Sequence, residues 1–139
     1  MPTGYLLDTN FVSEARRPRP NPGVVAFLDA HNPDQSFVSA MTVGELRKGI
    51  AVRHLRDIVA AKRLAEWVDQ FEAEYADRIL PVDRAVARIW GELLAVRPLP
   101  IVDTLIAATA LSHRLTLVTR NTRDFTATGV EVHNPWTSD

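Results

Sequence analysis

Short apolar runs alternate along this chain with longer stretches of helical periodicity, and this alternation constrains the fold more than any other feature. Each run is short and mostly apolar, as expected for a strand that helices cover on both faces. The strand candidates are 5–7, 36–39, 79–82, 115–118 and 130–132. Strands that alternate with helices are typical of an α/β domain. We therefore expect a mainly parallel central sheet of about five short strands, flanked by helices.

The stretches between these runs carry apolar residues at helical spacing. Helices are expected from Pro22 through Leu28, over 41–51, over 57–75, from about Asp83 onward, and over 102–113. The last stretch is rich in alanine and apolar almost all round, which predicts the most buried helix. The two helices before it are expected to form a small, otherwise exposed subdomain.

Length and composition exclude several classes of protein. The 139 residues suit one domain, which we expect to span 1–139. Sixteen Lys and Arg against 17 Asp and Glu leave no overall basic excess, so nucleic-acid binding would need a local patch. The absence of cysteine excludes disulfides and thiolate metal sites. No run approaches the ~18 apolar residues that span a bilayer, and none resembles a signal peptide. A cytoplasmic protein without membrane association is expected.

Two acidic residues occupy positions that indicate a site. Asp8 closes the run 5–7, at the carboxyl edge of the predicted sheet, where ligand crevices form in open α/β folds. A capping role for Asp8 is an equal alternative. Asp103 lies in the first turn of the buried helix and shares a face with Ile106 and Ala107. The alternative for Asp103 is a favourable interaction with the helix dipole. Because that interaction requires no inward orientation, a role in a site is the favoured interpretation.

Two further acids are weaker signals when taken singly. Glu45 lies near the margin of the apolar face of its helix, and Gly49 follows one turn later. Glycine in a helix costs about 1 kcal/mol relative to alanine, so we interpret Gly49 as clearing space beside Glu45. A solvated glutamate is the simpler alternative. Asp124 follows the run 115–118 in a polar segment, where a cap or turn is the default.

Topology brings these acids together. The carboxyl ends of parallel strands and the amino ends of neighbouring helices share one edge, which places Asp8, Asp103 and Asp124 there, and the Glu45 helix also follows a strand. Two carboxylates ~4 Å apart repel by about 4 kcal/mol at an effective dielectric of 20. Protons or a divalent cation must offset this repulsion. Oxygen ligands without cysteine or paired histidine favour Mg²⁺ or Mn²⁺ over Zn²⁺.

The segments that carry these acids resemble a known family. Segments 6–10, 42–46, 102–110 and 117–125 are similar in order and spacing to the four motifs of PIN-domain ribonucleases. More narrowly, they resemble the VapC-family toxins of VapBC toxin–antitoxin systems, including the FitB-like branch. The resemblance covers nearly the whole chain. It implies a PIN-like fold and a metal-dependent endoribonuclease that hydrolyses RNA phosphodiester bonds with a metal-activated water.

The resemblance also assigns roles to single residues. It implies metal coordination and catalysis by Asp8, Glu45, Asp103 and Asp124, with Mg²⁺ as the cofactor and Mn²⁺ as the alternative. Thr119 and Asn121 match supporting polar positions. Many relatives carry Asp where Asn121 stands, which leaves one or two metals open. Basic residues near the motifs are candidate RNA contacts, with a solvated surface as the alternative for each. They are Arg16, Arg17, Arg19, Arg47, Lys48, Arg120 and Arg123.

The implied partners are an RNA substrate, a cognate VapB-like antitoxin in the same cytoplasm, a second copy in a homodimer, and a toxin–antitoxin hetero-oligomer. The alternative is a catalytically silent PIN-like module that binds RNA or protein, and the presence of all four acids argues against it. A haloacid-dehalogenase-type phosphatase would need a second Asp where Asn10 stands. A receiver domain would need a Lys where Thr119 stands, so both are disfavoured.

Overall fold

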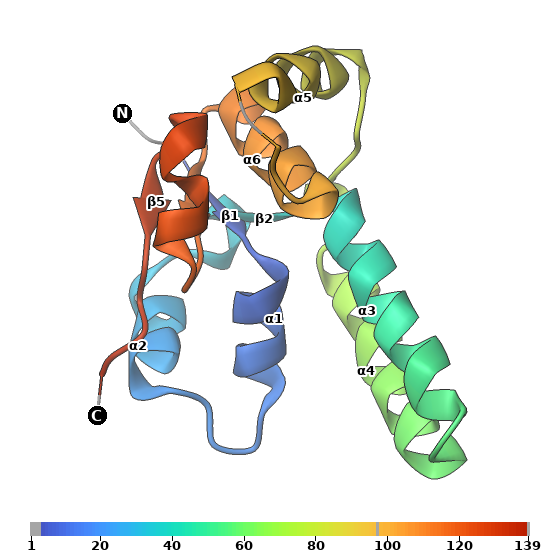
Figure 1. Ribbon diagram of the computed structural model, residues 1–139. Helices are drawn as coiled ribbons and strands as arrows, with labels where there is room; N and C mark the ends of the chain where they lie inside the picture. Colours follow the sequence, from blue (N-terminus) through green and yellow to red (C-terminus); the bar gives the residue numbers. More distant parts are fainter. Residues whose placement is uncertain (1–3, 97, 139) are drawn as a thin grey trace.

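The computed structural model describes residues 4–96 and 98–138 and contains one all-parallel sheet of five short strands (Figure 1). The strands are β1 (Tyr5–Leu7), β2 (Ser36–Ser39), β3 (Ile79–Leu80), β4 (Thr116–Val118) and β5 (Val132–His133). Their spatial order is β3-β2-β1-β4-β5, with every neighbouring pair parallel. This confirms the expected α/β fold class.

Helices connect the strands and cover the sheet. The helices are α1 (Thr9–Arg16), α2 (Pro22–Ala30), α3 (Ala40–His54), α4 (Ile58–Glu74), α5 (Arg84–Val96) and α6 (Ile101–His113). The 3-10 turns are η1 (Pro33–Gln35), η2 (Ala76–Arg78) and η3 (Thr122–Thr128). Helix α1 was not expected, because it is only eight residues long and runs directly into a proline-rich loop.

Three strands are shorter than their apolar runs, each for a local reason. β3 ends at Leu80 because Pro81 has no amide hydrogen for the ladder. β4 begins at Thr116 because the Leu115 amide still caps α6, donating to the Ala110 carbonyl at 2.9 Å. β5 begins at Val132 because Gly129, in the left-handed region at φ 76°, ends η3 just before it.

The strand side chains alternate between two apolar cores, one on each face of the sheet. Leu6 and Leu117 pack with Ile106 of α6 in the first core. Leu7 and Val118 belong to the second core, which the residues of α1 and α2 complete. Both helix layers are visible in Figure 1, with α6 above the strands and α1 and α2 below. The sheet is thus covered on both faces, which explains its apolar runs.

Helix α6 is the most buried helix, as its composition predicts. Ile106, Ala107, Ala108 and Ala110 are all fully buried. Small alanine side chains let α6 approach both the sheet and α5. In the described part of the chain, no helix is both long enough and apolar enough to cross a membrane.

Helices α3 and α4 pack against each other and project from the body as a hairpin, whereas α5 packs on α6 (Figure 1). The expectation that α4 and α5 form a subdomain together is therefore wrong. The apolar stripe of α4, which includes Val68 and Phe71, joins Leu46 of α3 in the second core. Leu93 of α5 packs instead against the core that contains α6.

Gly49 lies inside α3, and the interpretation that it clears space beside Glu45 is wrong. A methyl group on Gly49 would meet only Leu64 Cδ2, at an ordinary contact distance of 3.9 Å. We therefore expect Gly49→Ala to raise the free energy of unfolding by about 0.5–1 kcal/mol, because alanine loses less backbone entropy in a helix. Urea denaturation measures this change.

Gly23 provides the matched control for this prediction. A methyl group on Gly23 would lie 1.9 Å from the Pro135 carbonyl oxygen, so Gly23→Ala must displace the C-terminal segment. We expect Gly23→Ala to destabilise the protein, in the direction opposite to Gly49→Ala. Destabilisation by Gly49→Ala would show that the interior of α3 is more crowded than the structure indicates.

Candidate active site

The chain changes direction across the sheet at β1. It passes from β1 to β2 and β3 on one side, and then returns through α5 and α6 to β4 on the other side. Open α/β sheets bind ligands outside the carboxyl ends of their strands at such a switch point. Asp8 directly follows β1, and Thr119 directly follows β4. The topology therefore places both residues at the preferred position for a site.

Asp8 is almost completely buried, with 4% of its surface exposed. Its Oδ1 accepts the Thr9 amide at 2.8 Å, and its Oδ2 accepts the Thr119 hydroxyl at 2.8 Å. Burial raises the pKa of Asp8 to about 6, against the lowering effect of these two hydrogen bonds, and the charges of Asp103 and Glu45 raise it further. Asp8 thus caps α1, as the alternative proposed, and is also a buried acid held at the switch point.

Glu45 is held by a hydroxyl from the segment that carries Asp8. Thr9 Oγ1 lies 2.6 Å from Glu45 Oε1 and 3.0 Å from Thr42 Oγ1. Thr9 has one hydroxyl proton, and a carboxylate can only accept. The Thr9 proton therefore goes to Glu45, and the Thr42 hydroxyl donates to Thr9. This chain of hydroxyls fixes Glu45 relative to Asp8, since Thr9 also donates its amide to Asp8.

Thr9 and Thr42 are candidate site residues that the sequence reasoning missed. Thr9 contacts Thr42 and Glu45, which lie 33 and 36 residues later in the chain, so no local sequence pattern reveals these contacts. One signal was available: each threonine lies beside an acid or one helical turn before it, and Thr42 occupies a buried position.

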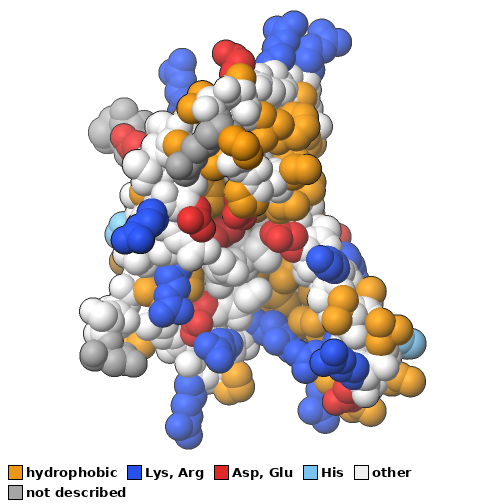
Figure 2. Space-filling view, in the orientation of Figure 1, with side chains coloured by type: hydrophobic (Ala, Val, Ile, Leu, Met, Phe, Trp, Pro, Cys, Tyr) orange, Lys and Arg blue, Asp and Glu red, His pale blue; other side chains and the backbone are white. Residues whose placement is uncertain are grey.

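Asp103 and Asp124 complete the acidic cluster, which we define as Asp8, Glu45, Asp103 and Asp124. Asp103 lies in the first turn of α6 and is partly buried, and Asp124 lies in the first turn of η3 and is exposed. Burial raises the pKa of Asp103, and the charges of Glu45 and Asp124 raise it further. Figure 2 shows acidic side chains gathered in the hollow below α6, with Lys and Arg side chains around them.

The acidic cluster offers donors that suit a hard divalent cation. All of its ligating atoms are carboxylate oxygens, which Mg²⁺ and Mn²⁺ prefer. Over residues 4–96 and 98–138, none of the four acids forms an ion pair, and their mutual repulsion is uncompensated. In the same residues, no three such side chains lie close enough to share an ion as they stand. The donor chemistry fits a cation, and joint coordination requires the carboxylates to approach further.

The basic residues predicted to contact RNA lie in different parts of the structure. Arg16, Arg17 and Arg120 line one pocket of about 490 Å³, together with the supporting candidate Asn121. Arg47 instead bridges the helical hairpin: its Nη2 lies 2.7 Å from Asp69 Oδ1, and its Nε lies 2.9 Å from Glu72 Oε2. Arg47 therefore has a role in holding α3 to α4. Arg19, Lys48 and Arg123 are exposed.

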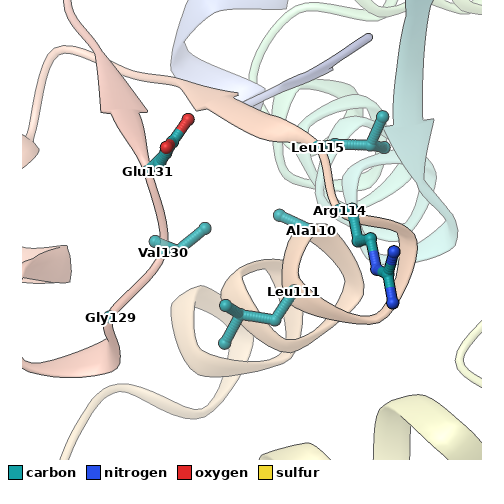
Figure 3. Close-up of a pocket in the computed structure, with 7 residues that line it drawn as sticks. All are labelled: Ala110, Leu111, Arg114, Leu115, Gly129, Val130 and Glu131. Atoms are coloured by element: carbon teal, nitrogen blue, oxygen red, sulfur yellow. The ribbon is translucent and has the colours of Figure 1, made fainter. Parts of the chain in front are cut away.

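A second pocket lies at the opposite end of α6, away from the acidic cluster. It has a volume of about 420 Å³ and is lined by the last turn of α6 and by residues 129–131. Figure 3 shows the Arg114 guanidinium and the Glu131 carboxylate on opposite sides of it. None of the candidate site residues lines this pocket. The carboxyl edge of the sheet, rather than this pocket, is the candidate active site.

Comparison with known proteins identifies the family. The PIN domain family matches residues 5–131. Toxin FitB of Neisseria gonorrhoeae is 41% identical over 138 residues, which cover 94% of this chain and 97% of that protein. VapC ribonuclease Y4jK of Sinorhizobium fredii is 35% identical, covering 94% of this chain and 96% of that protein. The crystal structure of FitAcB from Neisseria gonorrhoeae matches with a TM-score of 0.86 at 41% identity, covering 95% of this chain and 98% of the other. The chain therefore belongs to the PIN-domain family and, within it, to the VapC/FitB family of toxins.

Proposed function

We propose that this chain is a metal-dependent endoribonuclease that acts as the toxin of a type II toxin–antitoxin system. The observation that carries the proposal is the buried Asp8 at the switch point, within electrostatic reach of Glu45 and Asp103. The relative named VapC ribonuclease Y4jK supports the reaction class, and the relative named toxin FitB supports the role as a toxin. Residues 1–139 form a single PIN-like domain in this proposal.

Each residue of the site has a proposed task. Asp8, Glu45, Asp103 and Asp124 hold Mg²⁺ or Mn²⁺. A bound cation supplies activation of a water and offsets the charge that develops on the phosphoryl oxygens. Thr119 donates to Asp8 Oδ2 and, together with the Thr9 amide on Oδ1, fixes the orientation of that carboxylate. Thr9 orients Glu45 in the same way. No covalent nucleophile from the protein is needed.

The proposed partners follow from the relatives. FitAcB and the toxin–antitoxin complex from Klebsiella pneumoniae are structural neighbours of this chain. We propose that this chain likewise forms a hetero-oligomer with a cognate VapB-like antitoxin. We further propose that it forms a homodimer and acts in the cytoplasm, where RNA and the antitoxin are available.

Incubation of the purified protein with total RNA tests the function. We expect cleavage with Mg²⁺ or Mn²⁺ and none with a chelator. The Asp103→Asn variant, purified identically, separates this activity from contaminating nuclease. A catalytically silent binding module would bind RNA without producing fragments under any of these conditions. Equal cleavage with and without the chelator would contradict the metal-dependent reaction.

Removal of the Thr9 hydroxyl should impair the site through Glu45. We expect Thr9→Val to lower kcat/KM for RNA cleavage by about tenfold or more, because a hydrogen bond to a charged group is worth about 1.5–3 kcal/mol. Thr9→Ser keeps the hydroxyl and should retain most of the activity. Cleavage of a labelled oligonucleotide measures both variants. Equal activity of the valine and serine variants would remove Thr9 from the site.

A further inference from the structure

We propose that the pocket beside α1 binds one backbone phosphate of the RNA, next to the linkage that is cleaved. We call it the arginine pocket, and its polar lining is Asn10, Ser13, Glu14, Arg16, Arg17, Arg120 and Asn121. The inference rests on the proposed ribonuclease function and names the part of the substrate that this pocket recognises.

The arginine pocket adjoins the acidic cluster through the backbone. Asn10 lies two residues after Asp8, at the start of α1. On the other side, the Asn121 amide donates to Thr119 Oγ1 at 3.1 Å, and the Thr119 hydroxyl donates to Asp8. The segments 8–10 and 119–121 therefore build both the acid site and one wall of the pocket. A strand bound at the acids can therefore reach this wall.

The charge of the arginine pocket suits a phosphate. Three arginines and one acid, Glu14, line it, so its net charge is +3 − 1 = +2 in a chain whose total is −1. Glu14 is already engaged: its Oε2 accepts the Asn21 amide at 2.9 Å, and its Oε1 lies 3.3 Å from Arg17 Nη1. In the described residues, Arg16 and Arg120 form no ion pair. The Arg16 guanidinium lies over the Trp67 ring, 6.0 Å from its centroid, and its hydrogen-bond donors remain unpaired with any acid of the described chain.

The acidic cluster repels the RNA backbone electrostatically, and the arginine pocket can offset this repulsion. Four carboxylates repel an incoming phosphate backbone, so the site alone disfavours its own substrate. A positively charged pocket next to the acids offsets this repulsion and fixes the register of the strand. Side-chain contacts to phosphate oxygens position a nucleic acid without reading its sequence. We therefore expect the arginine pocket to set where the strand lies rather than which base is chosen.

Figure 2 agrees with this arrangement. Lys and Arg side chains lie below the acidic side chains, over the region that α1 and α2 occupy in Figure 1. Trp136 adds an apolar wall to the pocket and packs edge-on against Phe11, with ring centroids 6.0 Å apart. This wall is held by the core, which keeps the pocket in shape.

Binding to an RNA that cannot be cut tests the proposal. In the Asp103→Asn background, we expect Arg120→Ala and Arg16→Ala each to weaken binding of a labelled single-stranded RNA by about fivefold to tenfold. The slope of log K against log salt should fall by about 0.7 for each phosphate that the protein no longer neutralises. The control is Arg88→Ala, an exposed arginine of α5 outside the pocket, which should bind within twofold of its parent.

Neutral linkages identify the phosphate. The cleaved linkage is first mapped with the wild-type protein, and each linkage near it is then replaced singly by an uncharged methylphosphonate. We expect one replacement next to the cleaved linkage to weaken binding by at least the factor seen for Arg120→Ala. In a variant that carries both Arg16→Ala and Arg120→Ala, that replacement should have no further effect.

The outcomes separate the two proposals. If the wild type cuts RNA but Arg16→Ala and Arg120→Ala bind like Arg88→Ala, the arginine pocket is overturned and the ribonuclease stands. If every neutral linkage has the same small effect, the assignment to one phosphate is overturned. If these variants bind RNA normally but lose binding to a poly-glutamate peptide, the pocket binds protein instead, and the phosphate assignment is overturned. If the wild type cuts no RNA with either metal, the proposed function fails, and the pocket assignment fails with it.

Discussion

Asp103→Asn should abolish RNA cleavage, with a loss of at least about 100-fold in the single-turnover rate. Loss of a residue that only supports a metal ligand costs about 10–100-fold, and loss of a ligand should cost more. Burial raises the pKa of Asp103, and the charges of Glu45 and Asp124 raise it further, so the Asp103 carboxylate interacts with both of these acids. Asparagine keeps the shape of the side chain and removes its charge, so the change isolates electrostatics.

Asp29 provides the matched control for this substitution. It is an exposed acid of α2 outside the acidic cluster, so Asp29→Asn makes the same change of charge without touching the site. Its cleavage rate should stay within twofold of the wild type. Circular dichroism should show that both variants are folded. Cleavage by Asp103→Asn at the rate of Asp29→Asn would remove Asp103 from the reaction.

Asp8→Asn should make the metal-free protein more stable near neutral pH, by about 2 kcal/mol. The pKa of Asp8 is about 6 in the folded protein, above its ordinary value of 3.8. Below pH ~4 the carboxyl is protonated in both the folded and the unfolded states. As the pH rises from ~4 to ~6, the unfolded chain releases its proton first, and the folded state loses stability.

The size of this effect follows from the pKa difference. A rise of about two units corresponds to about 3 kcal/mol lost at pH 7, because each unit is worth about 1.4 kcal/mol. Asparagine cannot ionise and avoids this loss. Its oxygen can still accept the Thr9 amide, but the Thr119 hydroxyl loses its carboxylate acceptor, which costs about 1 kcal/mol.

Urea denaturation with a chelator, repeated from pH 4 to pH 8, measures the difference between the two proteins. The free energy of unfolding of Asp8→Asn should start slightly below that of the wild type at pH ~4, rise relative to it by about 3 kcal/mol up to pH ~6, and then stay a constant amount above it. Curves that stay parallel over the whole range would mean that Asp8 is not buried as an uncompensated acid.

The architecture could be predicted from the sequence because its signals are local. The apolar runs of β1 and β2 indicate strands that are covered on both faces, and the alanines of α6 indicate a helix without an exposed face. The first and last residues of the strands could not be predicted, since they depend on helix caps and turns such as those at Leu115 and Gly129. The packing of α4 against α3 depends on tertiary contacts, and the apolar stripe of α4 alone does not specify which helix it packs against.

The site could be predicted in outline for the same reason. Asp8 and Asp103 lie at positions that topology alone brings to one edge. The hydroxyls that hold the acids were harder to find, because Thr119 reaches Asp8 across 111 residues of chain. Arg47 shows the converse difficulty: its position near Glu45 in sequence suggested an RNA contact, and its actual neighbours are Asp69 and Glu72 on α4.

Titration of the chelator-treated protein with Mn²⁺ tests the central claim most directly, since it asks whether the acidic cluster binds a divalent cation. Electron paramagnetic resonance counts the free Mn²⁺ at each step. We expect saturable binding by the wild type and by Asp29→Asn, weakened at least about tenfold in both Asp8→Asn and Asp103→Asn. Equal Mn²⁺ affinity in all four proteins would show that these carboxylates hold no metal.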